Sequence, residues 1–128
     1  MPAPSSFDYA IIRVVPRVER DEFINAGVIV HSPSLDFLEA RVELDEARLT
    51  ALWPEVDVKE VREHLAVFPR IAAGDRKAGP IAQLPRSQRF HWLVAPRSTV
   101  LQISPVHAGM CETAEGMVER LLTRFVRR

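Results

Sequence analysis

The stretch FDYAIIRVV, residues Phe7–Val15, decides the fold. In its first half the large apolar residues Phe7, Tyr9 and Ile11 alternate with Asp8 and Ala10. Pro16 follows the stretch, and the pattern predicts a strand that ends at Val15. Its second half is apolar on both faces except for Arg13. That composition is typical of an interior strand, in which a lone arginine reaches a specific partner or extends to a sheet edge.

Two further strands are predicted around this one. Phe23–His31 follows the polar connection Arg17–Glu22 and is expected to pair back on the first strand as a hairpin. Gly27 within it predicts a β-bulge or a close backbone approach. Phe37–Glu43 alternates between apolar and polar residues, as a strand with one solvated face does.

Helical patterns begin after Leu44. Asp45 is a suitable N-cap for a short helix through Leu52, and Asp57 with Glu60 predicts a capping box for a second helix. Pro69 is expected to kink or end that helix, with a short further turn closed by Gly74.

The C-terminal half is predicted to contain two strands and one helix. Asp75–Arg89 is rich in proline and glycine and is interpreted as a long loop. Phe90–Ala95 and Thr99–Ile103 are predicted strands, and Pro105–Cys111 is a predicted loop. Thr113 would cap a final helix with an apolar stripe, in which the arginines near the C-terminus suit the helix dipole.

The order βββ-α-α-ββ-α predicts an α+β fold, a mostly antiparallel sheet of about five strands with helices packed on one face. The 128 residues suit a single domain, expected over residues 7–128 after a flexible N-terminus of residues 1–6.

Several classes of protein are disfavoured. There is no apolar run of the roughly 20 residues that cross a bilayer and no signal peptide, so no membrane association is expected. The lone Cys111 excludes an internal disulfide and favours the cytoplasm. The histidines lack metal-binding spacing, and no phosphate-binding glycine loop occurs, so neither a metal nor a cofactor is expected.

The zero net charge conceals an asymmetry. Residues 1–65 contain 7 basic and 13 acidic residues, whereas residues 66–128 contain 10 and 4. The second half could form a basic face that attracts phosphates or an acidic partner, or the two halves could pack so that their charges intersperse. Its basic loop region comprises Arg70, Arg76, Lys77, Arg86, Arg89 and Arg97.

Two groups of polar residues are candidate sites. Arg97, Ser98, Thr99 and His107 surround two predicted strand ends and could hold a phosphate or carboxylate, or could satisfy backbone groups at a turn. Asn25, with Gly27 and the nearby Glu22, forms the second group, for which a β-bulge is the simpler interpretation.

The segments Tyr9–Pro16, Glu22–Val30 and Ala95–His107 resemble the bacterial family known as domain of unknown function 3037, over nearly the whole chain. The resemblance implies a small bacterial protein without an established reaction, encoded beside a HipA-like kinase homologue and therefore a candidate partner of it. The motif residues that it carries over are Arg13, Glu22, Asn25, Gly27, Arg97, Ser98, Thr99 and His107.

Three functions remain open from the sequence. The first is a non-enzymatic accessory protein that binds another protein, or itself, through the polar strand-end surface. The second is a nucleic-acid or phosphate binder that uses the basic loop, although the pI of about 6.9 argues against it. The third is a small hydrolase or transferase in which Arg97 grips an anion, His107 is a general base and Glu22 orients it.

Overall fold

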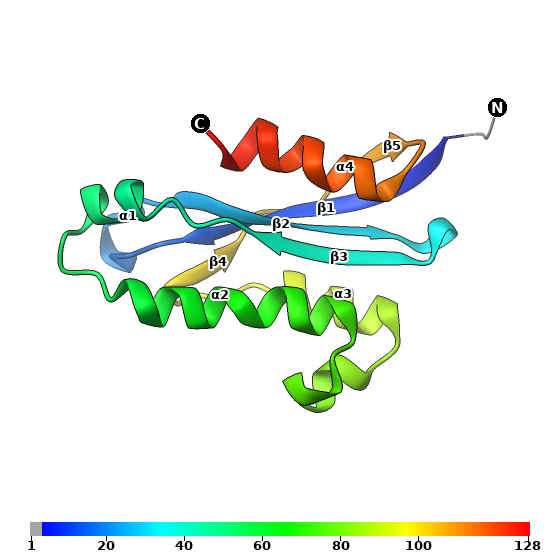
Figure 1. Ribbon diagram of the computed structural model, residues 1–128, viewed down its shortest axis with the longest axis horizontal. Coiled ribbons are helices and arrows are strands. Elements are labelled where there is room, and N and C mark those ends of the chain that lie inside the picture. The colour runs from blue at the N-terminus through cyan, green and yellow to red at the C-terminus, as the bar shows by residue number, and fades with distance from the viewer. Residues whose placement is uncertain (1–3) are drawn as a thin grey trace.

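The computed structural model describes residues 4–128 and consists of one antiparallel sheet between helices (Figure 1). The central strand β1 pairs with β2 on one side, and β2 with β3. On its other side β1 pairs with β5 along its first half and with β4 along its second half. The strands are β1 (Ser5–Val14), β2 (Ile24–Ser32), β3 (Phe37–Val42), β4 (Leu101–Ile103) and β5 (His107–Cys111).

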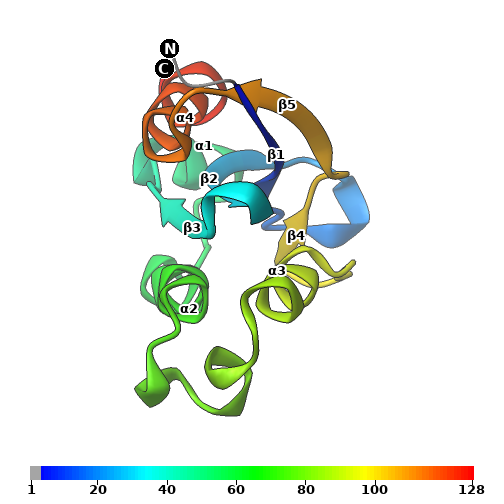
Figure 2. The same cartoon turned by 90° about the vertical axis from the view of Figure 1, so that its right-hand side faces the viewer.

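The helices lie on both faces of this sheet (Figure 2). They are α1 (Glu46–Leu52), α2 (Val58–Ala73), α3 (Arg86–Val94) and α4 (Ala114–Leu121), the last continued by a π-helical turn, Leu122–Val126. The α+β class and the five antiparallel strands are confirmed. The expectation that the helices pack on one face is wrong, because α2 and α3 cover one face and α4 covers the other.

The α2–α3 face is the more completely covered one. Leu65 and Phe68 of α2 and Leu93 of α3 are buried against Ile12 and Ile29 of the sheet. Burial of these side chains supplies most of the hydrophobic stabilisation on this side.

Helix α2 begins and ends as the sequence predicts, but it is not interrupted. The Asp57 carboxylate accepts a hydrogen bond from the backbone N–H of Glu60, and Gly74 ends the helix with a φ of 74°. Pro69 lies inside the helix, which continues to Ala73. Packing of Phe68 and Ile71 on the sheet offsets the hydrogen bond that proline cannot donate.

The α4 face is narrower and has its own core. Val118, Leu121 and Leu122 pack on Val28 and Val30 of β2. The sheet between α4 and the edge strand β5 is left without a helix above it (Figure 2).

Two element predictions in the C-terminal half are wrong. Phe90–Ala95 is helical, because its buried residues, Phe90 and Leu93, are three apart, while Trp92 is 37% exposed. The segment predicted as a loop before Cys111 contains β5, which is a strand only because it pairs with β1. Strand β4 lies within the predicted Thr99–Ile103.

The predicted irregularity at Gly27 is confirmed. Ile12 pairs with Gly27 but Arg13 pairs with Asn25, so Ala26 is the extra residue of a β-bulge. A Cβ at Gly27 would lie 2.7 Å from the backbone oxygen of Arg41, so the neighbouring strand approaches too closely for any other residue.

The N-terminal boundary lies within the stretch that was expected to be flexible. Residues 1–3 of that stretch are outside the described residues. Ser5 and Ser6 belong to β1, opposite Cys111 and Met110. The sheet therefore begins two residues before Phe7.

Candidate functional site

Arg13 lies near the end of β1, on the α4 face and partly buried. Its guanidinium carbon is 4.4 Å from the centre of the Phe23 ring, a cation–π arrangement. Within residues 4–128 it has no ion pair, and its Nε is buried without an acceptor. A partly buried guanidinium without an anion is costly, so this position favours a negatively charged ligand.

Asn25 stands directly across from Arg13 because of the bulge. Its Nδ2 donates a hydrogen bond of 2.9 Å to the backbone oxygen of Phe125 in the π-helical turn. This bond settles the orientation of the amide and leaves Oδ1 buried without a donor in the described part of the chain. In regular pairing Ala26 would oppose Arg13, and this contact with the C-terminal turn would be lost.

Ser104, which follows β4, and His107, the first residue of β5, complete the lining. Ser104 bridges the gap between the two strands, since its Oγ accepts from the Ile11 N–H at 2.8 Å and donates to the Pro105 oxygen at 2.9 Å. His107 opens β5 opposite Tyr9, with its exposed ring 5.4 Å from the tyrosine ring.

These residues enclose a cavity of about 370 Å³, here called the Arg13 pocket. Its lining combines one cationic group with several aromatic walls. The lining residues are Tyr9, Ile11, Arg13, Phe23, Asn25, Ser104, His107 and Phe125. The structure thus brings together three of the candidate residues from the sequence, Arg13, Asn25 and His107.

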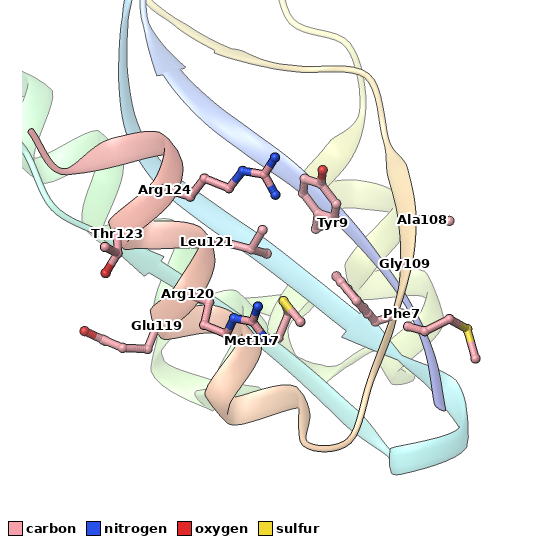
Figure 3. A pocket seen from close by; sticks show the side chains of 11 residues that line it. Phe7, Tyr9, Ala108, Gly109, Met117, Glu119, Arg120, Leu121, Thr123 and Arg124 are labelled. Atoms are coloured by element: carbon pink, nitrogen blue, oxygen red, sulfur yellow. The ribbon is translucent and has the colours of Figure 1, made fainter. Parts of the chain in front are cut away.

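A larger hollow of about 570 Å³, here called the β5–α4 groove, adjoins this pocket at Tyr9 (Figure 3). Phe7 and Tyr9 form its floor, and the Phe7 ring occupies the space above Gly109, where a Cβ would lie 2.7 Å from that ring. Arg120 and Arg124 extend into it from the α4 side (Figure 3), and Met110, which is 62% exposed, belongs to β5 on the other side.

The charges at this groove are not neutralised internally. The chain has 15 arginines: ten donate a hydrogen bond to a carboxylate or a backbone oxygen, and Arg62 forms an ion pair with Glu46. The four without such an acceptor among the described residues are Arg13, Arg76, Arg120 and Arg124, and three of these line the pocket or the groove.

Acidic residues near the groove do not change this result. Glu119 also lines the groove, but its carboxylate is already paired with Arg41 and Arg127. The hydrogen bond from Arg127 holds the pKa of Glu119 below its usual value. Glu112 shares a smaller neighbouring hollow with Arg120, and no ion pair within 4.0 Å joins the two in the described structure.

The second group of candidate residues is placed elsewhere. The Arg97 guanidinium donates to the backbone oxygens of Leu93 at 2.8 Å, Ala95 at 3.0 Å and Trp92 at 3.0 Å, and it stacks over the rings of Trp92 and Phe68. Burial lowers the pKa of Arg97. Arg97 therefore satisfies backbone groups, as the structural interpretation expects, but these are the last carbonyl groups of helix α3 and not those of a turn between strands.

The neighbours of Arg97 and the acidic candidate have local roles. Thr99 Oγ1 donates to the Leu101 oxygen at 3.3 Å, and Ser98 is exposed. Glu22 forms an exposed ion pair with Arg20 and does not line the Arg13 pocket.

The catalytic arrangement of Arg97, His107 and Glu22 is absent from the described structure. Arg97 packs on the α2–α3 face, where Phe68 belongs to the core, while His107 stacks on Tyr9 on the α4 face. A general base and an anion-binding group on opposite faces of a sheet cannot act on one substrate.

The basic loop region is mostly neutralised as well. Arg70 pairs with Asp75, Arg86 pairs with Asp36, and Arg89 donates to the Leu84 oxygen. With Arg97 engaged too, only Arg76 and Lys77 of that group have side chains without an acceptor in the described chain. The basic loop region therefore offers fewer free cations than its sequence suggests, which weakens the case for a nucleic-acid surface there.

Sequence analysis missed two important arginines of the groove. Arg120 and Arg124 are four residues apart and thus lie on one side of the last helix, beside the apolar Leu121. They were interpreted through the helix dipole alone. Their position along the edge of the apolar stripe is the sequence feature that could have identified them. Only the packing of α4 shows that this edge borders an open groove.

Two further findings concern the described residues only. No helix in residues 4–128 combines the length and apolar character needed to span a membrane. Nor does this range contain three or more His, Cys, Asp or Glu side chains grouped so that they could hold a metal ion.

The fold and the two hollows define a small α+β domain with an arginine-lined groove on one face of its sheet. The model of a family described as "Protein of unknown function (DUF3037)" matches residues 9–126, and the chain belongs to this family. No curated protein and no solved structure matches the chain.

Proposed function

We propose that the protein is a non-enzymatic accessory module that binds an acidic segment of another protein in the β5–α4 groove. One observation carries the proposal: three of the four arginines that lack an internal acceptor among the described residues line two neighbouring hollows that share Tyr9. Unpaired arginines beside apolar surface are typical of protein-binding sites, where they act as anchors.

The apolar content of the groove supports a protein ligand. Phe7, Tyr9 and Met117 contribute apolar surface, and Met110 is exposed at the edge. Methionine adapts to differently shaped partners, and aromatic side chains supply contact area at low entropic cost. A segment that alternates acidic and apolar residues would match both properties.

The family resemblance suggests which protein the partner is. A HipA-like kinase is the candidate that the family resemblance implies, and an acidic segment of such a protein would be the part that binds. The lone cysteine is buried, and this cysteine usage suits the cytoplasm, which is where we propose that the partner is found.

The test is an affinity purification from cytoplasmic extract at low and high salt, with the Arg120→Ala/Arg124→Ala variant beside the wild type. Arg76→Ala is the matched control, because Arg76 also lacks an acceptor but lies outside the groove. We expect one stoichiometric protein that the wild type and Arg76→Ala retain and the double variant loses.

Other outcomes decide against the proposal. Equal recovery with both variants would place the interface elsewhere. Recovery of nucleic acid alone, abolished by salt, would favour the nucleic-acid alternative. Recovery of an untagged copy of this chain alone would instead indicate self-association.

A further inference from the structure

The β5–α4 groove and the Arg13 pocket lie next to each other along β1, and the two together are here called the trough. Both hollows are lined by Tyr9, and their floor residues on β1 run from Phe7 to Arg13. At about 3.3 Å per residue this is a length of about 20 Å, which accommodates about six residues of extended chain.

The two ends of the trough differ in chemistry. Arg120 and Arg124 lie along its side, where they would meet the side chains of a bound segment. Arg13 lies at the other end, among the rings of Tyr9, Phe23 and Phe125. Phe23 also stacks on the Arg13 guanidinium and borders the trough beyond it.

We infer that the Arg13 pocket binds the C-terminal residue of the partner segment, with the terminal carboxylate on Arg13 and the last side chain among the aromatic rings. This inference rests on the proposed function. A C-terminal residue carries a carboxylate and an apolar side chain on the same carbon, which matches a pocket that pairs one guanidinium with aromatic walls. Guanidinium and carboxylate groups form bidentate, charge-assisted hydrogen bonds.

Asn25 acts here as a positioning residue. Its Oδ1 and the Nε of Arg13 are both buried without partners, and the two residues stand opposite each other across β1 and β2. Directly opposed side chains are within interaction distance of one another. Asn25, itself held by the Phe125 oxygen, therefore confines the Arg13 side chain and leaves the terminal nitrogens for the ligand.

His107 adds a second polar group at the entrance. Its ring is exposed beside Tyr9, on the strand that forms the other wall of the trough. In this position it contacts a ligand that lies between α4 and β5, and its nitrogens are available for hydrogen bonds to a carboxylate.

The experiment compares two peptides that differ only at the C-terminus. A fluorescently labelled six-residue peptide that alternates glutamate and leucine and ends in phenylalanine is titrated as the free acid and as the amide. We expect the amide to bind at least about tenfold more weakly, since it loses the charge-assisted pair with Arg13.

Variants separate this inference from the proposed function. Arg13→Lys keeps the charge but not the bidentate geometry, and it should reduce the acid-to-amide ratio toward one. Arg120→Ala/Arg124→Ala should weaken both peptides and preserve the ratio. Arg76→Ala should bind as the wild type does, and thermal unfolding of each variant verifies that it is folded.

Two results would overturn the inference. Equal affinities for acid and amide, both lost in the double variant, would mean that an acidic segment binds without anchoring its terminus, and the proposed function would survive alone. Binding of neither peptide at millimolar concentration would reject both the inference and the acidic-segment groove.

Discussion

The two faces of the sheet treat their arginines in opposite ways. On the α2–α3 face, Arg89 and Arg97 direct their guanidinium groups to backbone oxygens of the helices and loops around them. On the α4 face, Arg13, Arg120 and Arg124 have no acceptor within the described residues. The difference shows that Arg89 and Arg97 help to hold the first face together, whereas Arg13, Arg120 and Arg124 on the second face are available for a ligand.

The extent of cover explains this contrast. Two helices enclose the first face, so a charged group there is buried and needs an internal partner. The single helix α4 covers part of the second face (Figure 2), and the groove beside it is lined by exposed residues such as Met110, Arg120 and Arg124. Arg120 and Arg124 are exposed there and stay solvated without a ligand, whereas the buried Nε of Arg13 is left without an acceptor in the described chain.

The largest difference is expected in core stability. Leu65→Ala, at a side chain 2% exposed on the α2–α3 face, should lower the free energy of unfolding by about 2–5 kcal/mol. Met117→Ala, in the groove, should lower it by less than about 1 kcal/mol. Urea denaturation measures both, and equal losses would refute the view that one face carries most of the core.

A second test exchanges the roles of two arginines. Arg97→Ala should cost about 1–3 kcal/mol of folding stability, because three carbonyl groups lose their donor, and should leave peptide binding unchanged. Arg124→Ala should change stability by no more than about 0.5 kcal/mol and weaken binding. If Arg97→Ala weakened binding without unfolding the protein, the assignment of the faces would be incorrect.

One substitution should disturb both faces together. Gly27→Ala places a Cβ 2.7 Å from the Arg41 oxygen, and we expect a loss of about 1–3 kcal/mol from the resulting shift of strands. Because the same bulge puts Asn25 opposite Arg13, the preference for the free-acid peptide should also fall. Full retention of that preference would show that the bulge does not position Arg13.

The smallest expected effect is the pH dependence of folding stability that His31 contributes on the α2–α3 face. His31 is 6% exposed and its ring lies 4.6 Å from that of Phe90; burial lowers its pKa below 6.5. The folded state therefore favours neutral His31, which contributes stability above pH 6.5 that is lost as the pH falls through the lowered pKa. His31→Phe keeps the ring and removes the titration.

The measurement is the urea midpoint of wild type and His31→Phe between pH 7.5 and 5. As the pH falls below 6.5, the urea midpoint of the wild type should decrease relative to that of His31→Phe. A constant difference would mean that His31 has the same pKa in the folded and unfolded states.

Local signals in the sequence predicted the elements that local physics governs. Helix caps at Asp45 and Asp57 are confirmed by their hydrogen bonds to the backbone N–H groups of Arg48 and Glu60. The bulge at Gly27 is confirmed as well. Each of these depends on residues a few positions apart, where side-chain type and backbone geometry are directly linked.

Elements that depend on distant partners were not predictable in this way. The helix α3 was mistaken for a strand because a short run such as Phe90–Ala95 suits either period, and its burial against α2 and β2 decided between them. Strand β5 has the composition of a loop and is extended because β1 offers it hydrogen bonds.

The sequence by itself indicated the class of fold, the irregularity at Gly27 and the starts of α1 and α2, because these follow from patterning, turn chemistry and helix capping. The family resemblance named Arg13, Asn25 and His107 as motif residues without placing them in one site. The tertiary structure alone decided that Arg13, Asn25 and His107 meet while Arg97 lies on the opposite face. It alone also decided which arginines lack an acceptor. The pairing of a guanidinium depends on atoms brought within about 3 Å of it by the whole fold, and no local pattern specifies that distance.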